Sequence, residues 1–227
     1  MINPGSWPDG SLLARLSEPE RLDLLHGGTK VSFGRGDFMM RQGELGTTLF
    51  VLLAGCAKVT WTTATGTVTI VALRGRGDLV GEFAVIDEMP RTAHVVALDL
   101  VTAIRIGRIR FLAFCAEHPE VTRLVMRSLT DKIRQTTGLS AVGRAVSSRM
   151  RIAALLYDVA TEYGVPQPDS TVVVPPLTQA DLAALAGVAS STVERILKEL
   201  REDGILLSRY RKTVILDMNA LLAQAAE

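Results

Sequence analysis

The chain has 227 residues, of which 48% are hydrophobic and 22% are charged, a composition typical of a globular protein with one large domain or two smaller ones. Its net charge of +1 excludes a polycation, so any binding to nucleic acid has to come from a local basic patch. No uncharged apolar run reaches the roughly 18 residues of a membrane span, and we expect no membrane partner.

The N-terminal segment up to Gly28 is expected to form a short helix. The first ten residues contain Pro, Gly and Asp in place of an apolar segment, so they do not resemble a signal peptide. Leucines then form an apolar face, and Pro19 begins a new turn. They are Leu12, Leu13, Leu16, Leu22, Leu24 and Leu25. We expect this face to pack against the domain that follows.

From Thr29 to about Ile109, short runs rich in β-branched residues alternate with glycine turns. The clearest runs cover residues 49–53, 68–73 and 94–98. Glycine supplies the positive φ that tight turns need. Short strands separated by such turns predict a β-sandwich or barrel.

One stretch in this half, residues 81–93, combines Glu82 and Arg91 with glycine in a short turn framed by apolar residues. Opposite charges at such a place need polar partners. The combination suits a small anion that also carries hydroxyl groups. The alternative is a mutual salt bridge between Glu82 and Arg91.

Near Arg110 the apolar period changes from two to about 3.6, which predicts helices. A short helix is expected over Phe111–Glu117, and a long one follows Pro119. A narrow stripe on the long helix favours packing against a partner helix, with packing on its own barrel as the alternative. The stripe consists of Val121, Val125, Leu129, Ile133, Thr136, Leu139, Val142 and Val146. Ser147 and Ser148 are expected to cap a further helix, Arg149–Tyr163.

The C-terminal part predicts two helices and a hairpin. Thr178 is a good N-cap for the first helix, a turn follows at Gly187, and the second helix runs from Ser190 to Leu200. This is the helix-turn-helix pattern, whose second helix enters the DNA major groove. Two strands after Gly204 form a hairpin with a basic tip, which suits phosphate contact or is simply a solvated turn.

The candidate DNA-binding residues lie on these elements. They are Thr178, Ser190, Ser191, Thr192, Arg195, Lys198, Arg209, Arg211 and Lys212. From Ser140 onward the chain has nine basic and ten acidic residues, so we expect each protomer to bind DNA with modest affinity. A dimer that reads two half-sites would raise it.

From about Leu22 to Leu216 the chain resembles the CRP/FNR family of bacterial transcription regulators. The resemblance rests on Gly81-Glu82-Phe83-Ala84, on Pro90-Arg91-Thr92-Ala93 and on residues 182–200. It implies an α+β fold: a cyclic-nucleotide-binding β-roll, or jelly roll, with an N-terminal helix (residues 1–118), a dimerisation helix (119–146) and a winged helix-turn-helix (147–227).

The resemblance also implies a ligand, cyclic AMP, as an allosteric effector. Arg91 would pair with the cyclic phosphate, and Glu82 would accept from the ribose 2′-hydroxyl. Thr136 and Thr137, aligned through residues 151–153, would meet the adenine. The cradle would be completed by backbone N–H groups near Gly81, Phe83, Thr92 and Ala93, and by the Thr92 hydroxyl.

The implied protein is a cytoplasmic homodimer, not an enzyme, that binds double-stranded DNA and works with RNA polymerase. Its recognition helix departs from the best-known family pattern, Ser-Arg-Glu-Thr-Val, because residues 189–193 read Ala-Ser-Ser-Thr-Val. Only Arg195 keeps a guanine-reading side chain. We therefore expect a DNA site that differs from the family consensus.

Other cofactors and functions are disfavoured. No cysteine precedes Cys56, so an N-terminal iron–sulfur cluster is not expected, and Cys56 and Cys115 form no metal-binding pair. His26, His94 and His118 have no ligand spacing, which argues against haem, metal and a jelly-roll metalloenzyme. The remaining alternative keeps the fold and the DNA binding, but with no effector or with a different one.

Overall fold

The computed structural model describes residues 7–141, 147–209 and 212–226; the side chains of residues 135–141 and of residue 209 lie outside the description. The chain divides into two compact units, Met1–Arg134 and Gln135–Glu227. The division falls within the long helix α5 (Pro119–Ala141). None of the helices in the described ranges is long and apolar enough to cross a membrane.

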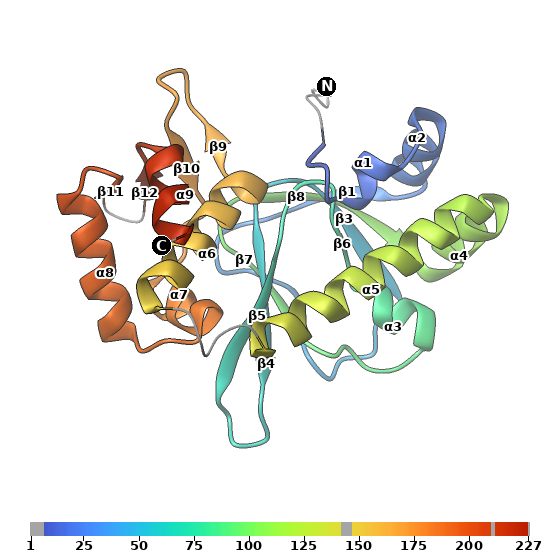
Figure 1. Ribbon diagram of the computed structural model, residues 1–227. Coiled ribbons are helices and arrows are strands. Elements are labelled where there is room, and N and C mark those ends of the chain that lie inside the picture. Colours follow the sequence, from blue (N-terminus) through green and yellow to red (C-terminus); the bar gives the residue numbers. More distant parts are fainter. Residues whose placement is uncertain (1–6, 142–146, 210–211, 227) are drawn as a thin grey trace. The chain divides into compact units, whose positions relative to one another are not determined.

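The strands described in the first unit form two antiparallel four-stranded sheets (Figure 1). The first sheet has the order β1 (Thr29–Phe33), β8 (Val101–Gly107), β3 (Thr48–Ala54), β6 (Leu79–Val80). The second has the order β2 (Phe38–Met40), β7 (His94–Ala97), β4 (Ala57–Thr62), β5 (Val68–Arg74). The three runs singled out in the sequence coincide with β3, β5 and β7, which confirms the prediction of a β-rich half.

Strand β3 is apolar after Thr48, and its residues 49–53 are buried on both faces of the sheet. Side chains alternate between the faces of a strand. Leu49, Val51 and Leu53 join a cluster with the helices of this unit, whereas Phe50 and Leu52 join a cluster between the two sheets. The first sheet is therefore covered by helices on its outer face and by the second sheet on its inner face.

The helices of the first unit besides α5 are α1 (Leu12–Arg15), α2 (Glu18–His26), α3 (Glu82–Asp87) and α4 (Arg108–Glu117). Leu12, Leu13 and Leu24 are buried against the roll, as the N-terminal apolar face predicted. Leu22 was expected on the same face, but its side chain is 48% exposed. Residues two apart point to different sides of a helix, so Leu22 and Leu24 cannot share one face.

The apolar stripe of α5 is divided between two surroundings. Val121 and Val125 are buried in the core of the roll, and Leu129 packs against that core. Packing against a partner helix is the expectation for the whole stripe, and for these first three members it is wrong. Ile133 is 54% exposed. The side chains of the stripe's later members, from residue 136 onward, lie outside the description.

The second unit contains a helix-turn-helix and a small sheet. Its other elements besides the end of α5 are α6 (Ser148–Tyr163), β9 (Val165–Pro166), β10 (Val172–Val174), α7 (Gln179–Ala186), α8 (Ser190–Glu202), β11 (Leu206–Arg209), β12 (Lys212–Ile215) and α9 (Met218–Ala226). The sheet has the order β11-β12-β10-β9, so the expected hairpin is present. Strand β9 and helix α9 were not expected. The buried Leu221 attaches α9 to the core.

Candidate functional site

One pocket in the first unit gathers the β-roll residues that the sequence singled out. Those residues are Gly81, Glu82, Phe83, Arg91, Thr92 and Ala93. The pocket encloses about 80 Å³. Its remaining lining is mostly apolar, with two further cations, Arg74 and Lys132. An apolar lining with a few convergent polar groups is the usual composition of a small-molecule site.

Two glycines make room for the Arg91 guanidinium. Gly81 has φ 87°, a conformation that strongly favours glycine, and it lies between the end of β6 and the start of α3 at Glu82. A Cβ atom on Gly81 would lie 2.6 Å from Arg91 Nη1, and one on Gly46 would lie 2.2 Å from Arg91 Cζ. Either contact would displace the arginine, so both positions need a residue without a side chain.

Arg91 is held by backbone carbonyls. Its Nη1 donates to the Gly81 carbonyl at 2.7 Å, and its Nη2 donates to the Thr48 carbonyl. Burial lowers the pKa of Arg91, while the carboxylates of Glu82 and Glu44 act in the opposite direction. A guanidinium has five N–H donors and remains charged in proteins. The two carbonyls thus orient the cation and leave it capable of binding an anion.

Glu82 is 2% exposed and forms an ion pair with Lys132, a residue of α5 that the sequence analysis did not single out. Lys132 Nζ lies 2.6 Å from Glu82 Oε1 and also donates to the Leu79 carbonyl at 2.6 Å. Among the described ion pairs, none joins Glu82 to Arg91, so the alternative of a mutual salt bridge is not observed. Lys132 precedes Thr136 by four residues, a spacing that puts both on one helix face. This spacing is the sequence signal that indicates Lys132 as a residue near the ligand.

The structure describes the side chains of only some of the remaining ligand candidates. Thr92 is exposed at the pocket, and Ala93 and Phe83 are half-buried in its lining. Thr136 and Thr137 belong to α5, but their side chains lie outside the description. Their contact with a ligand stays a prediction.

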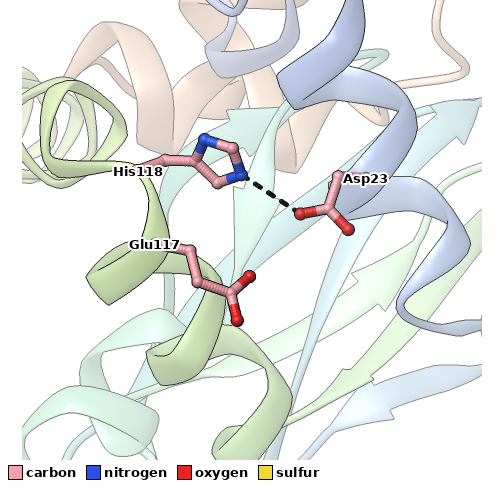
Figure 2. A group of neighbouring side chains, drawn as sticks. All are labelled: Asp23, Glu117 and His118. Carbon is pink, nitrogen blue, oxygen red and sulfur yellow. Dashed lines mark hydrogen bonds and ion pairs between the residues drawn. The ribbon is translucent and has the colours of Figure 1, made fainter.

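A cluster of one histidine and two carboxylates was not expected from the sequence. His118 Nε2 lies 3.2 Å from Asp23 Oδ2, and the ligand atoms of Asp23, Glu117 and His118 all lie within 4.8 Å of one another (Figure 2). Arg110 forms ion pairs with both Asp23 and Glu117. This arginine supplies the positive charge that the two carboxylates need. The cluster therefore joins α2 to α4 without requiring a metal.

The helix-turn-helix is built from local signals that the sequence contains. Thr178 caps α7, because its Oγ1 accepts from Asp181 N at 3.0 Å, and Asp181 in turn accepts from Thr178 N. Gly187 turns the chain with φ 64°. Val193, Ile196 and Leu200 are buried on one face of α8. The opposite face of α8 is therefore the one that can meet DNA.

The structure places four DNA-binding candidates, Ser190, Ser191, Arg195 and Lys198, on exposed positions of α8. Thr192 is half-buried. Of the other candidates, Thr178 uses its hydroxyl to cap α7, and Lys212 is exposed. The side chains of Arg209 and Arg211 lie outside the description.

Comparison with known proteins recognises the same two parts. Residues 30–118 match the cyclic nucleotide-binding domain, and residues 150–224 match the Crp-like helix-turn-helix domain. The Cyclic AMP receptor protein of Thermus thermophilus is 30% identical to this chain over 202 residues, which cover 87% of this chain and 88% of that protein. The CRP-like cAMP-activated global transcriptional regulator of Mycobacterium tuberculosis is 26% identical over 195 residues, which cover 86% and 87%.

Among solved structures, FixK2 from Bradyrhizobium japonicum shares the fold with a TM-score of 0.73 at 18% identity, over 88% of this chain and 98% of that one. A β-roll joined to a helix-turn-helix defines a class of DNA-binding regulators. With a relative at 30% identity over most of its length, this chain belongs to the CRP/FNR family of transcription regulators. The members of that family regulate transcription and are not enzymes.

Proposed function

We propose that this protein is a homodimeric regulator whose affinity for DNA is controlled by cyclic AMP bound in the β-roll pocket. The observation that carries the proposal is the convergence of Arg91 and Glu82 on one pocket beside the Gly81 turn. Arg91 offers a fork of donors to the cyclic phosphate, and Glu82 offers an acceptor to a ribose hydroxyl. Lys132 and Arg74 add positive charge and so favour an anion.

Cyclic AMP is proposed over cyclic GMP because of Thr136 and Thr137, since a threonine hydroxyl can both donate to and accept from an adenine edge. The two relatives named for cyclic AMP support the same choice. In the proposed dimer the exposed part of α5 meets its copy, and each helix-turn-helix reads one half-site. The protein would act in the cytoplasm and contact RNA polymerase.

Calorimetry with cyclic AMP, cyclic GMP and cyclic di-GMP tests the ligand. We expect cyclic AMP to bind the wild type, and Arg91→Lys to weaken binding by about tenfold or more, because a lysine is a point charge without the fork. Arg35→Lys is the matched control, because Arg35 is exposed and lies outside the pocket lining. Thermal unfolding checks that both variants are folded.

Two results would contradict the proposed ligand: no binding of any of the three nucleotides to the wild type, or equal binding of cyclic AMP by wild type and Arg91→Lys.

A second candidate function keeps the DNA binding but has no cyclic-nucleotide effector. The observation that favours it is the ion pair between Glu82 and Lys132, because the carboxylate meant for the ribose already has a cation 2.6 Å away. On this alternative the pair holds α5 against the roll permanently. DNA affinity that is unchanged by cyclic AMP would support it.

A further inference from the structure

The carboxylate of Glu199 on the recognition helix α8 lies between two arginines. Its Oε1 forms an ion pair with Arg195 Nη1 of the same helix, one turn earlier. Its Oε2 lies 2.7 Å from Arg149 Nη1, in the first turn of α6. Each oxygen of the carboxylate thus takes a different guanidinium.

Arg149 is itself fixed by other contacts. Its Nη2 lies 2.7 Å from Asp203 Oδ2, just after α8, and its Nε donates to Gln224 Oε1 of α9 at 2.6 Å. The hydrogen bonds to Asp203 and Glu199 raise the pKa of Arg149. One guanidinium therefore ties the start of α6 to both the last turn of α8 and the C-terminal helix. Glu199 is anchored to this framework and is only 32% exposed.

Arg195, by contrast, is 63% exposed and lies on the face of α8 opposite its buried residues. An isolated surface pair four residues apart holds a side chain weakly. A pair whose acceptor is fixed from a second direction restricts the arginine more strongly. A side chain ordered before binding loses less entropy when it meets its partner.

We propose that Glu199 is a positioning residue for DNA recognition, which holds Arg195 ready to read a base in the major groove. The proposal rests on the proposed DNA-binding role of Arg195. Glu199 also places a negative charge near the phosphates. Its presence therefore lowers affinity for DNA of any sequence while it sharpens preference at the base that Arg195 reads.

The two effects have opposite signs, which separates positioning from a merely structural role. Glu199→Gln removes the charge and keeps the shape, and it replaces one of the two oxygens that each accept from a different arginine with an NH2 group, which is a donor. We expect tighter binding to DNA of unrelated sequence and weaker preference at one base pair. A loss of folding would weaken binding to both kinds of DNA.

The matched control is Glu202→Gln. Glu202 lies on the same helix and loses the same charge, but its only ion pair described is the 3.8 Å contact with Lys198. We expect it to bind unrelated DNA more tightly with its base preference intact. Arg149→Lys serves as a second variant of the anchor, since it keeps the charge but loses the fork that reaches Glu199, Asp203 and Gln224.

The experiment first selects duplexes from a random library with the wild-type protein, with and without cyclic AMP. Fluorescence anisotropy then measures binding to the selected duplex, to each of its single-base-pair variants and to a scrambled duplex. A bidentate arginine–guanine contact discriminates by about 5- to 150-fold. We expect Arg195→Ala to abolish this preference at one position of each half-site, and Glu199→Gln and Arg149→Lys to reduce it at that same position by about threefold or more.

If Glu199→Gln keeps the full wild-type preference, Glu199 does not position Arg195 and the proposal fails. If Arg195→Ala leaves the preference unchanged at every position, the failure lies with the proposed role of Arg195 in reading DNA. Weaker binding of Glu199→Gln to the scrambled duplex would assign Glu199 a purely structural role.

Discussion

At the scale of single residues, the pocket depends on a charge from a distant part of the chain. Glu82 is almost fully buried, and its ion-pair partner Lys132 comes from α5, 50 residues later. A buried carboxylate without a partner is costly. An intact buried ion pair, however, adds little net stability compared with uncharged side chains of similar volume. The contact therefore makes the position of α5 and the state of the pocket depend on each other.

This dependence predicts the effect of Lys132→Met on stability. We expect the free energy of unfolding to fall by about 3 kcal/mol, because Glu82 is left buried and unpaired. Adding Glu82→Gln should recover most of the loss, because the amide carries no charge. Urea unfolding measures all three proteins.

Arg123→Met is the control, since Arg123 and its partner Glu120 are mostly exposed and such pairs contribute less than about 1 kcal/mol. If Lys132→Met unfolded at the same urea concentration as the wild type, Glu82 would not depend on Lys132.

The sequence predicted the local part of this site and missed the distant part. Gly81, Glu82 and Arg91 lie in one short stretch, residues 81–91, and Glu82 and Arg91 are charged residues in an apolar surrounding. Gly46 had no such signal, because it is one glycine among many, and the one signal for Lys132 was its place four residues before Thr136 on the same helix face. The contacts themselves follow from the fold, which brings Lys132 to Glu82 and Gly46 to Arg91.

At the scale of elements, α5 has two surfaces with different tasks. Val125 is 4% exposed in the core of the roll, whereas Met126, the next residue, is 61% exposed. The apolar period of the sequence shows that a helix face is covered, but it contains no information about what covers it. That is why the sequence predicts a partner helix for the whole stripe, although its first three members pack on the roll.

The two neighbouring residues give a matched pair of substitutions. Val125→Ala should lower the free energy of unfolding by about 2 kcal/mol, through lost burial and a cavity, and leave dimerisation unchanged. Met126→Asp should leave the fold intact but weaken the proposed dimer by about tenfold or more, because it puts a charge into an apolar interface. Sedimentation equilibrium and urea unfolding separate the two effects. A dimer unaffected by Met126→Asp would place the interface elsewhere.

At the scale of the whole molecule, the order of a β-rich part, a long helix and a helix-turn-helix followed from changes in apolar period and from caps and glycine turns. Helix α9 was missed because no strong signal precedes it besides Asp217, which caps it by accepting from Ala220 N at 2.9 Å. Strand β9 was missed because it has only two residues. Short elements of this kind are set by tertiary packing.

The proposed switch is a population shift between arrangements of the dimer. A ligand changes such an equilibrium only by its difference in affinity for the two states. If cyclic AMP favours the DNA-binding arrangement, then DNA must raise the affinity for cyclic AMP by the same factor. This reciprocity distinguishes a true coupling from a separate effect of the nucleotide on stability.

The most direct test measures the affinity of the full-length protein for its selected duplex with and without saturating cyclic AMP, at fixed salt concentration. We predict that the nucleotide raises the affinity by about 5- to 150-fold, that Arg35→Lys responds in the same way, and that Arg91→Lys needs about tenfold more cyclic AMP or higher for the same response. Equal DNA affinity with and without cyclic AMP, in a wild-type protein that binds the nucleotide, would contradict it.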